Sequence, residues 1–195
     1  MSESPLLVER DGAVAILTLN RPTTRNALNR ELVVALGRAL ASAAEDAQVR
    51  AVVLTGSGGS FCSGADLRSA MTEVGDGDMG QRIDEFHAMI RAIVSAPKRF
   101  VAAVDGGAVG FGADLALACD LRVLSTEGYI QEKFVKIGLM PDGGGTFWMP
   151  RLVGLGRALE FLMLGTKIEA GQAAELGLAN RVVAPSELAT TARAL

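Results

Sequence analysis

The stretch from Val101 to Thr146 constrains this chain more than any other part of its sequence. Residues Val101–Val104 are apolar and rich in valine, which is typical of a buried strand. Four glycines follow within seven residues, and a helix-forming run, Ala113–Cys119, comes directly after them. Glycines between a strand and a helix let a ligand approach the backbone, and the first N–H groups of the helix have no partner within it.

Those N–H groups, together with the positive end of the helix dipole, favour a negative oxygen. Asp114 lies in the first helical turn, and Asp142 lies in a second glycine-rich segment, residues 141–146. Oxyanion donors beside carboxylates indicate proton chemistry next to a carbonyl group. A tight structural turn or a phosphate cradle would also fit the glycines, although the sequence has no GxxxxGK[ST] motif and no GxGxxG directly after Val104.

Length and charge narrow the classes of function. At 195 residues we expect a single domain, residues 1–195, with a sizeable core. Nineteen basic against 22 acidic residues give a net charge of −3 with no basic run, which argues against a nucleic-acid partner. No apolar run reaches the ~20 residues of a membrane span, and the first residues are not typical of a signal peptide, so we expect a cytoplasmic protein without a membrane partner.

The residues that most often bind metals are scarce. Cys62 and Cys119 are the only cysteines and His87 is the only histidine. Two cysteines do not form a disulfide framework, and neither a zinc motif nor a Ser-His-Asp mechanism has the side chains it needs. We therefore expect no metal site, and we expect His87 on the surface of a helix.

The order of hydrophobic segments predicts an α/β protein. Asp11-Gly12 predicts a hairpin between Leu6–Arg10 and Ala13–Leu19. A leucine every four residues predicts a helix over Ala27–Ala44, capped by Asn26 or Asn29. The remaining chain predicts strands at 51–55, 121–124 and 180–183, and helices over 83–96, 146–153, 156–164, 169–176 and after Pro185, with interruptions at Pro150 and Gly154. Helices packed outside stacked sheets are the expected arrangement.

Two segments, residues 103–120 and 138–146, together resemble the signature of the crotonase superfamily, the enoyl-CoA hydratase/isomerase group. The resemblance extends from about Val14 to the end of the chain. It implies a ββα spiral fold, an acyl-CoA substrate, no separate cofactor and a homotrimer or hexamer. Such chains normally continue with helices that cover the site and build the trimer, so with a last residue at Leu195 we expect those C-terminal helices to be absent.

The same resemblance implies an oxyanion hole built from two backbone amides, those of Ala65 and Phe111. The segment Ser63–Leu67 repeats the strand, glycine and helix order of the central stretch. The residues expected along the coenzyme A thioester are Gly64, Ala65, Asp66, Leu67, Gly110 and Phe111. Arg25, in the polar turn before the first helix, is expected near the coenzyme A phosphates.

The resemblance also predicts which carboxylates carry protons. Hydratases of the family use two glutamates; Asp114 occupies the first position and Phe134 the second, while Glu132 and Lys133 do not align with it. Asp142 matches the aspartate of the ring-epoxide isomerase of phenylacetate breakdown and of dienoyl-CoA isomerases. We therefore favour double-bond isomerisation, with Asp142 as the main catalytic residue and Asp114 as a weaker base.

Two alternatives remain open at this point. One is a hydratase that uses Asp114 and Asp142 together, and the other is a non-catalytic acyl-CoA-binding protein. Apolar side chains that could line the acyl pocket, or lie in the core instead, are Phe111, Met140, Phe147, Trp148 and Met149. The polar, glycine-containing segment 71–78 is predicted to be a loop beside that pocket.

Overall fold

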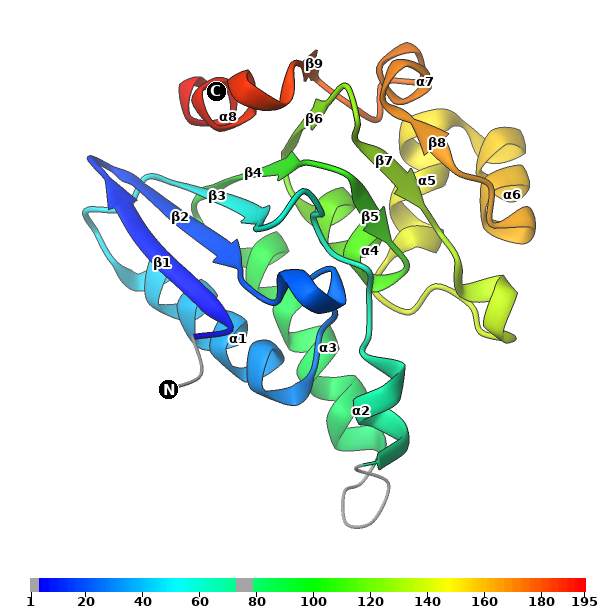
Figure 1. Ribbon diagram of the computed structural model, residues 1–195, viewed down its shortest axis with the longest axis horizontal. Helices are drawn as coiled ribbons and strands as arrows, with labels where there is room; N and C mark the ends of the chain where they lie inside the picture. The colour runs from blue at the N-terminus through cyan, green and yellow to red at the C-terminus, as the bar shows by residue number, and fades with distance from the viewer. Residues whose placement is uncertain (1–3, 73–78) are drawn as a thin grey trace.

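A six-stranded sheet forms the centre of the computed structural model, which describes residues 4–72 and 79–195. Its strand order is β1-β2-β3-β4-β6-β9 (Figure 1). The strands are β1 (Leu6–Asp11), β2 (Val14–Leu19), β3 (Ala51–Gly56), β4 (Arg99–Val104), β6 (Leu121–Ser125) and β9 (Arg181–Val183). β1 and β2 form the predicted antiparallel hairpin, with Asp11 opposite Val14, and every later neighbour in this sheet is parallel.

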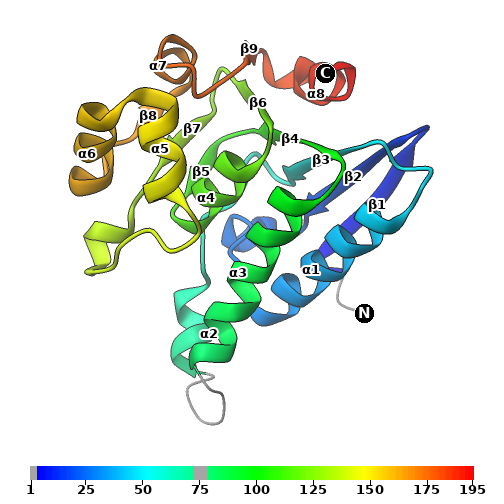
Figure 2. The same cartoon turned by 180° about the vertical axis from the view of Figure 1, so that it is seen from behind.

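Two long helices, α1 (Arg30–Glu45) and α3 (Met79–Ser95), pack against each other and cover one face of the sheet (Figure 2). Leu32, Leu36 and Leu40 of α1 are fully buried, which confirms the predicted apolar face. The predicted start at Ala27 is wrong. Asn29 caps the helix, because its side chain accepts a hydrogen bond from the Leu32 amide, 3.0 Å away. Residues 27 and 28 precede the helix and belong to the site described below.

The opposite face of the sheet has its own small core. Val53, Val101, Ala103 and Val123 project from it and pack with Leu188 and Ala192. The last two residues belong to α8 (Leu188–Ala194), which follows the short η3 (Pro185–Glu187). Because both faces are covered, the central strands are apolar on both sides, as in other parallel sheets.

A second sheet of three short strands, β5-β7-β8, lies beside the first. Its strands are β5 (Gly107–Val109), β7 (Tyr129–Gln131) and β8 (Ile168–Glu169). The neighbouring helices are α4 (Phe111–Ala118), α5 (Gly145–Val153), α6 (Leu155–Leu164) and α7 (Ala170–Glu175), with η2 (Phe134–Ile137) before α5. Figure 1 shows α5, α6 and α7 at the end of the molecule opposite the β1–β2 hairpin.

Two helix boundaries differ from the sequence prediction. Pro150 lies inside α5 instead of interrupting it, although a proline at the sixth residue of a helix removes one helical hydrogen bond. α4 begins at Phe111, two residues earlier than predicted, so that Gly112 is helical as well. The predicted loop over residues 71–78 lies mostly outside the described residues; residues 71 and 72 end α2 (Leu67–Thr72).

Candidate active site

A cavity of about 390 Å³ opens where the loop after β3 meets the N-terminus of α4. Its walls come from five parts of the chain: residues 28–33, 63–69, 82–86, 109–111 and 133–142. Six of the seven residues predicted to contact substrate lie along it, namely Gly64, Ala65, Asp66, Leu67, Gly110 and Phe111. The seventh, Arg25, is exposed and lies outside the lining.

The Ala65 amide points away from Leu28 because of how its loop is paired. Leu28 and Ala65 form an isolated parallel bridge. In it the Leu28 amide donates to the Gly64 carbonyl, 2.8 Å away, and the Asp66 amide donates to the Leu28 carbonyl, 3.0 Å away. Bonds from residues on either side of Ala65 direct its own N–H away from the bridge.

The Phe111 amide is the first of α4, so no helical carbonyl stands before it. Gly110 precedes it with a φ of 54°, which few other residues adopt. The two loops touch at Gly64: a methyl group added there would lie 2.8 Å from the Val109 carbonyl oxygen and 3.3 Å from the Phe111 nitrogen. Ala65 and Phe111 therefore belong to two cavity-lining segments that touch each other at Gly64.

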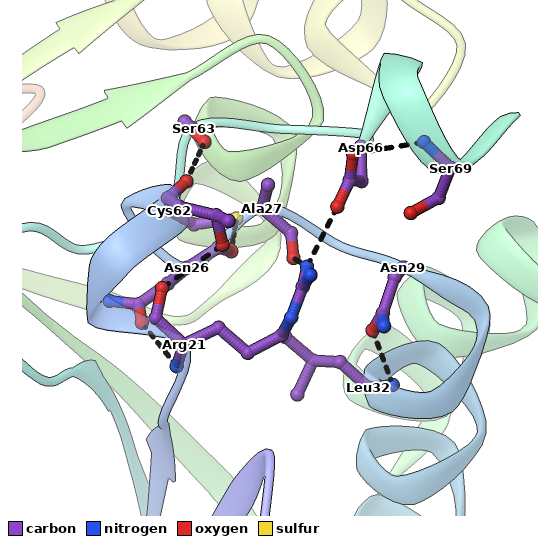
Figure 3. Close-up of polar contacts among 10 residues, drawn as sticks. Arg21, Asn26, Ala27, Asn29, Leu32, Cys62, Ser63, Asp66 and Ser69 are labelled. Carbon is purple, nitrogen blue, oxygen red and sulfur yellow. Dashed lines mark hydrogen bonds and ion pairs between the residues drawn. The ribbon is translucent and has the colours of Figure 1, made fainter. Parts of the chain in front are cut away.

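A polar network fixes the Ala65 loop (Figure 3). The Arg21 guanidinium donates to the Ala27 carbonyl and to Asp66, 3.0 Å away. Asp66 also accepts from the Ser69 amide at 3.2 Å. Burial alone would raise the pKa of Asp66, but the hydrogen bonds from Ser69 and Arg21 outweigh it and hold the pKa below its ordinary value. Asp66 thus anchors the loop as an ion.

Asn26 completes this network from inside. It is fully buried, and its side chain accepts from the Arg21 amide and donates to the Ser57 and Ser60 carbonyls, at 2.8, 3.0 and 2.7 Å. Its φ of 56° is tolerated because asparagine visits the left-handed region more readily than most residues. From the sequence, Asn26 was expected only as a possible cap of the first helix.

Asp142 lines the cavity near these amides. Asp142 is exposed to the cavity, and partial desolvation raises the pKa of its carboxyl, although a backbone hydrogen bond and the electrostatic interaction with His87 act in the opposite direction. A base with a raised pKa exchanges protons more readily near neutral pH than an ordinary aspartate. His87, predicted on the surface, is half-buried on α3 and close enough to Asp142 to influence it.

Asp114 occupies a different environment. It is fully buried and lies outside the cavity lining. Its two oxygens accept hydrogen bonds from the amides of Gly143 and Gly145, at 3.1 and 2.5 Å. Burial, together with the smaller effect of the Asp142 charge, raises the pKa of Asp114 to about 7 against the effect of these amides. Asp114 therefore holds the loop that carries Asp142.

A third carboxyl, Glu132, was missed as a candidate because it does not align with a catalytic position. Its side chain is 1% exposed, and neither oxygen has a hydrogen-bond partner among the described residues. The sequence does contain a signal for this burial. Ile130, Glu132 and Phe134 are buried in alternation with less buried neighbours, which is the period of an extended chain.

Known proteins resemble this chain in sequence and in fold. A sequence model of the enoyl-CoA hydratase/isomerase family matches residues 9–195. The chain belongs to this family. It is 36% identical to the short-chain-enoyl-CoA hydratase of Clostridium acetobutylicum over 99% of this chain and 74% of that one. It is also 36% identical to the 1,2-epoxyphenylacetyl-CoA isomerase of Escherichia coli, over 97% of this chain and 74% of the relative.

A solved structure carries a ligand of the expected kind. A Thermobifida fusca protein, crystallised in complex with acetoacetyl-CoA, superposes with a TM-score of 0.88 at 36% identity, over 98% of this chain and 78% of that one. The expected crotonase fold is therefore confirmed, and the chain is an enzyme of the enoyl-CoA hydratase/isomerase family. The alternative of a non-catalytic binding protein is set aside.

Basic side chains of this enoyl-CoA hydratase/isomerase family member lie together at the cavity, which the sequence did not predict. Arg30, Arg82 and Lys133 belong to the lining. Arg30 lies 3.7 Å from Glu85 in an exposed ion pair. These side chains come from segments separated by more than 40 residues, so only the fold brings them together.

The expected apolar wall is only partly present. Phe111 lines the cavity and packs edge-on against Phe86, with ring centroids 4.7 Å apart. Met140 and Phe147 are exposed, Met149 lies in the core, and Trp148 is half-buried beside Gly144. Phe134, Ile137 and Leu139 belong to the lining instead.

Other chemistry finds little support in the described part of the chain. Across residues 4–72 and 79–195, no three His, Cys, Asp or Glu side chains are arranged to hold a metal ion. Burial raises the pKa of both Cys62 and Cys119 to about 12, so neither thiol is reactive at neutral pH. No described helix is both long and apolar enough to cross a membrane.

Proposed function

We propose that this enzyme moves a carbon–carbon double bond along the acyl chain of an enoyl-CoA, with Asp142 as the proton carrier. One observation carries the proposal. Of the carboxylates that line the cavity, Asp66 pairs with Arg21 and Glu85 with Arg30, whereas Asp142 has no ion pair within the described residues. A single free base beside an oxyanion hole suits a reaction that removes and returns one proton.

The proposed steps balance without a co-reactant. The thioester carbonyl oxygen lies between the N–H groups of Ala65 and Phe111. Asp142 takes a proton from the carbon next to that carbonyl, and the electron pair spreads over the conjugated enolate, whose oxygen the two amides stabilise. Asp142 then returns the proton two carbons further along the chain, so the double bond moves and the base is restored.

Hydration of an enoyl-CoA is the alternative reaction, and the site favours it less. It needs one carboxylate to activate water and another to deliver a proton at the α-carbon. Asp114 is available for neither role while it is buried with both oxygens bound to amides. Phe134 carries no proton. In this proposal Asp114 contributes by positioning Asp142.

Purified enzyme incubated with a 3-enoyl-CoA and, separately, with crotonyl-CoA tests the proposal. Absorbance of the conjugated thioester should rise with the first substrate and remain nearly constant with the second. A fast fall of absorbance with crotonyl-CoA would mean hydration and would overturn the proposal. Thioesters of different length and aromaticity, compared by kcat/KM, would then define the acyl group.

We also propose that Arg30, Arg82 and Lys133 contact the phosphates of coenzyme A, with Arg25 further out. Phosphates are bound best by basic side chains that converge on one opening. Charge reversal at Lys133 should raise KM for the acyl-CoA with little change in kcat. An unchanged KM would remove Lys133 from this group.

Assembly as a homotrimer or hexamer in the cytoplasm is a further part of this proposal. Its support is a row of exposed apolar side chains on α6: Leu155, Leu159 and Met163 are 65, 47 and 66% exposed. Apolar surface of this kind is typical of a protein–protein contact. Light scattering that gives a stable monomer would contradict it.

A further inference from the structure

Glu132 and Asp114 are brought together by the backbone of a single residue, Gly110. Its amide donates to the Gln131 carbonyl, 2.8 Å away, which fixes the start of the segment that carries Glu132. Its carbonyl accepts from the Asp114 amide at 3.1 Å, which fixes the first turn of α4. Two carboxyls from elements distant in the sequence are thus held at one place.

Gly145 shows how close the two side chains are. A methyl group added to Gly145 would lie 2.6 Å from Glu132 Oε1 and 2.9 Å from Asp114 Oδ1. The two oxygens can therefore be no farther apart than the sum of those distances. Only the missing side chain of Gly145 leaves room for both.

The two carboxyls differ in their hydrogen-bond donors. Asp114 receives one backbone amide at each oxygen, whereas Glu132 receives none among the described residues, although its side chain is only 1% exposed. Amide donors favour an ionised carboxylate, and burial without donors favours a neutral acid. Two buried like charges at this distance would also repel each other. When the pair carries a single negative charge, these donors place that charge on Asp114 and the proton on Glu132.

We propose that Glu132 is a positioning residue that stays protonated at neutral pH and donates its O–H to Asp114. The bond gives the buried Glu132 hydroxyl an acceptor and keeps Asp114 as the single anion that binds the Gly143 and Gly145 amides. Those amides belong to the loop that carries Asp142, so the proton on Glu132 holds the catalytic carboxylate in place. The kinetic part of this inference rests on the proposed function.

The surrounding charges fit this assignment. Burial raises the pKa of Glu132 well above its ordinary value, and the charges of Asp114 and Asp142 raise it further. His87 on α3 acts on Asp142, Lys133 lines the cavity beside Glu132, and Arg151 of α5 packs over the Phe147 ring. No described cation forms a salt bridge with Glu132 or Asp114.

The test compares Glu132→Gln with Glu132→Leu. Glutamine keeps the shape and an N–H donor for Asp114, and it cannot lose a proton. We expect Glu132→Gln to retain most of the wild-type kcat at neutral pH and to lose the alkaline decline that the wild type shows when Glu132 ionises. Glu132→Leu, which has no donor, should lose on the order of 10²-fold in kcat because Asp142 shifts. Glu127→Gln makes the same substitution at an exposed position and should follow the wild type.

Infrared spectroscopy gives a readout that does not depend on turnover. The wild-type-minus-Glu132→Gln difference spectrum at neutral pH should contain the carbonyl stretch of a protonated carboxylic acid. Carboxylate bands in its place would overturn the inference, as would a kcat of Glu132→Gln as low as that of Glu132→Leu. If the wild type turns over no enoyl-CoA, the proposed function fails, and the infrared result still decides the protonation of Glu132.

Discussion

Three carboxyl groups lie around the glycine-rich loop, and their surroundings separate their roles. Asp142 lines the cavity, Asp114 is buried with an amide at each oxygen, and Glu132 is buried with no donor among the described residues. Desolvation raises the pKa of all three, so the donors decide which one carries charge. In the proposed mechanism, the same chemical group serves as the base in Asp142, as the loop anchor in Asp114 and as the proton holder in Glu132.

At this scale we predict unequal effects of two isosteric substitutions. Asp142→Asn removes the proton carrier and should lower kcat by about 10²–10⁴-fold, while thioester binding is nearly unchanged. Asp114→Asn keeps one acceptor for the loop amides and should have the milder effect on kcat. Steady-state kinetics with a 3-enoyl-CoA and calorimetric binding of the product measure both. Full activity of Asp142→Asn would exclude it as the base, and equal collapse of hydration in both variants would indicate a two-carboxylate hydratase.

Between elements, the site depends on how closely two strand-to-helix turns approach each other. Gly64 contacts the backbone at Val109 and Phe111, and the Arg21 and Asn26 network holds its loop from the other side. In the proposed mechanism, a movement of either loop would misplace one of the two amides that bind the thioester oxygen. The close approach explains why both turns are rich in glycine.

We predict that Gly64→Ala lowers kcat by about 10²–10³-fold, the usual loss when one oxyanion donor is misplaced. The new methyl group would lie 2.8 Å from the Val109 carbonyl oxygen, so one loop must move. Gly59→Ala is the matched control, because Gly59 also has a positive φ of 70° but no atom within 4 Å of the added methyl group. A Gly59→Ala variant as impaired as Gly64→Ala would attribute the loss to backbone strain instead.

Most helices, strands and glycine-rich loops could be predicted from the sequence. Features that depend on contacts between distant segments could not. The hairpin, the leucine face of α1 and the two glycine-rich turns follow from local patterns, and the structure confirms them. The start of α1 was misplaced because Leu28 is held by its bridge to Ala65, a tertiary contact. The burial of Asp114 behind its loop and the Asp114–Glu132 pair could not be predicted, because helical and extended periodicity do not reveal which residues meet across elements.

At the scale of the whole molecule, the two buried carboxyls make the folded protein bind protons more tightly than the unfolded chain does. A carboxyl whose pKa is raised on folding binds its proton more tightly in the native state, so its contribution to stability is fully present below its unfolded pKa and is lost as the pH rises through the folded value. For Asp114 that interval runs from 3.8 to about 7. Glu132 extends the same trend to higher pH, because its pKa is also raised.

We therefore predict that the free energy of unfolding decreases from about pH 4 to pH 7, by on the order of 3–4 kcal/mol from Asp114 if its interactions are absent in the unfolded chain. Glu132→Gln should flatten this dependence, because it removes a carboxyl that stays protonated in the folded protein while it ionises in the unfolded chain. Glu127→Gln should leave the dependence as in the wild type. Urea unfolding at a series of pH values and one protein concentration measures all three. If the free energy of unfolding of the wild type stays constant or rises between pH 4 and 7, the buried carboxyls do not keep their protons in the folded protein over this pH range, and the prediction is wrong.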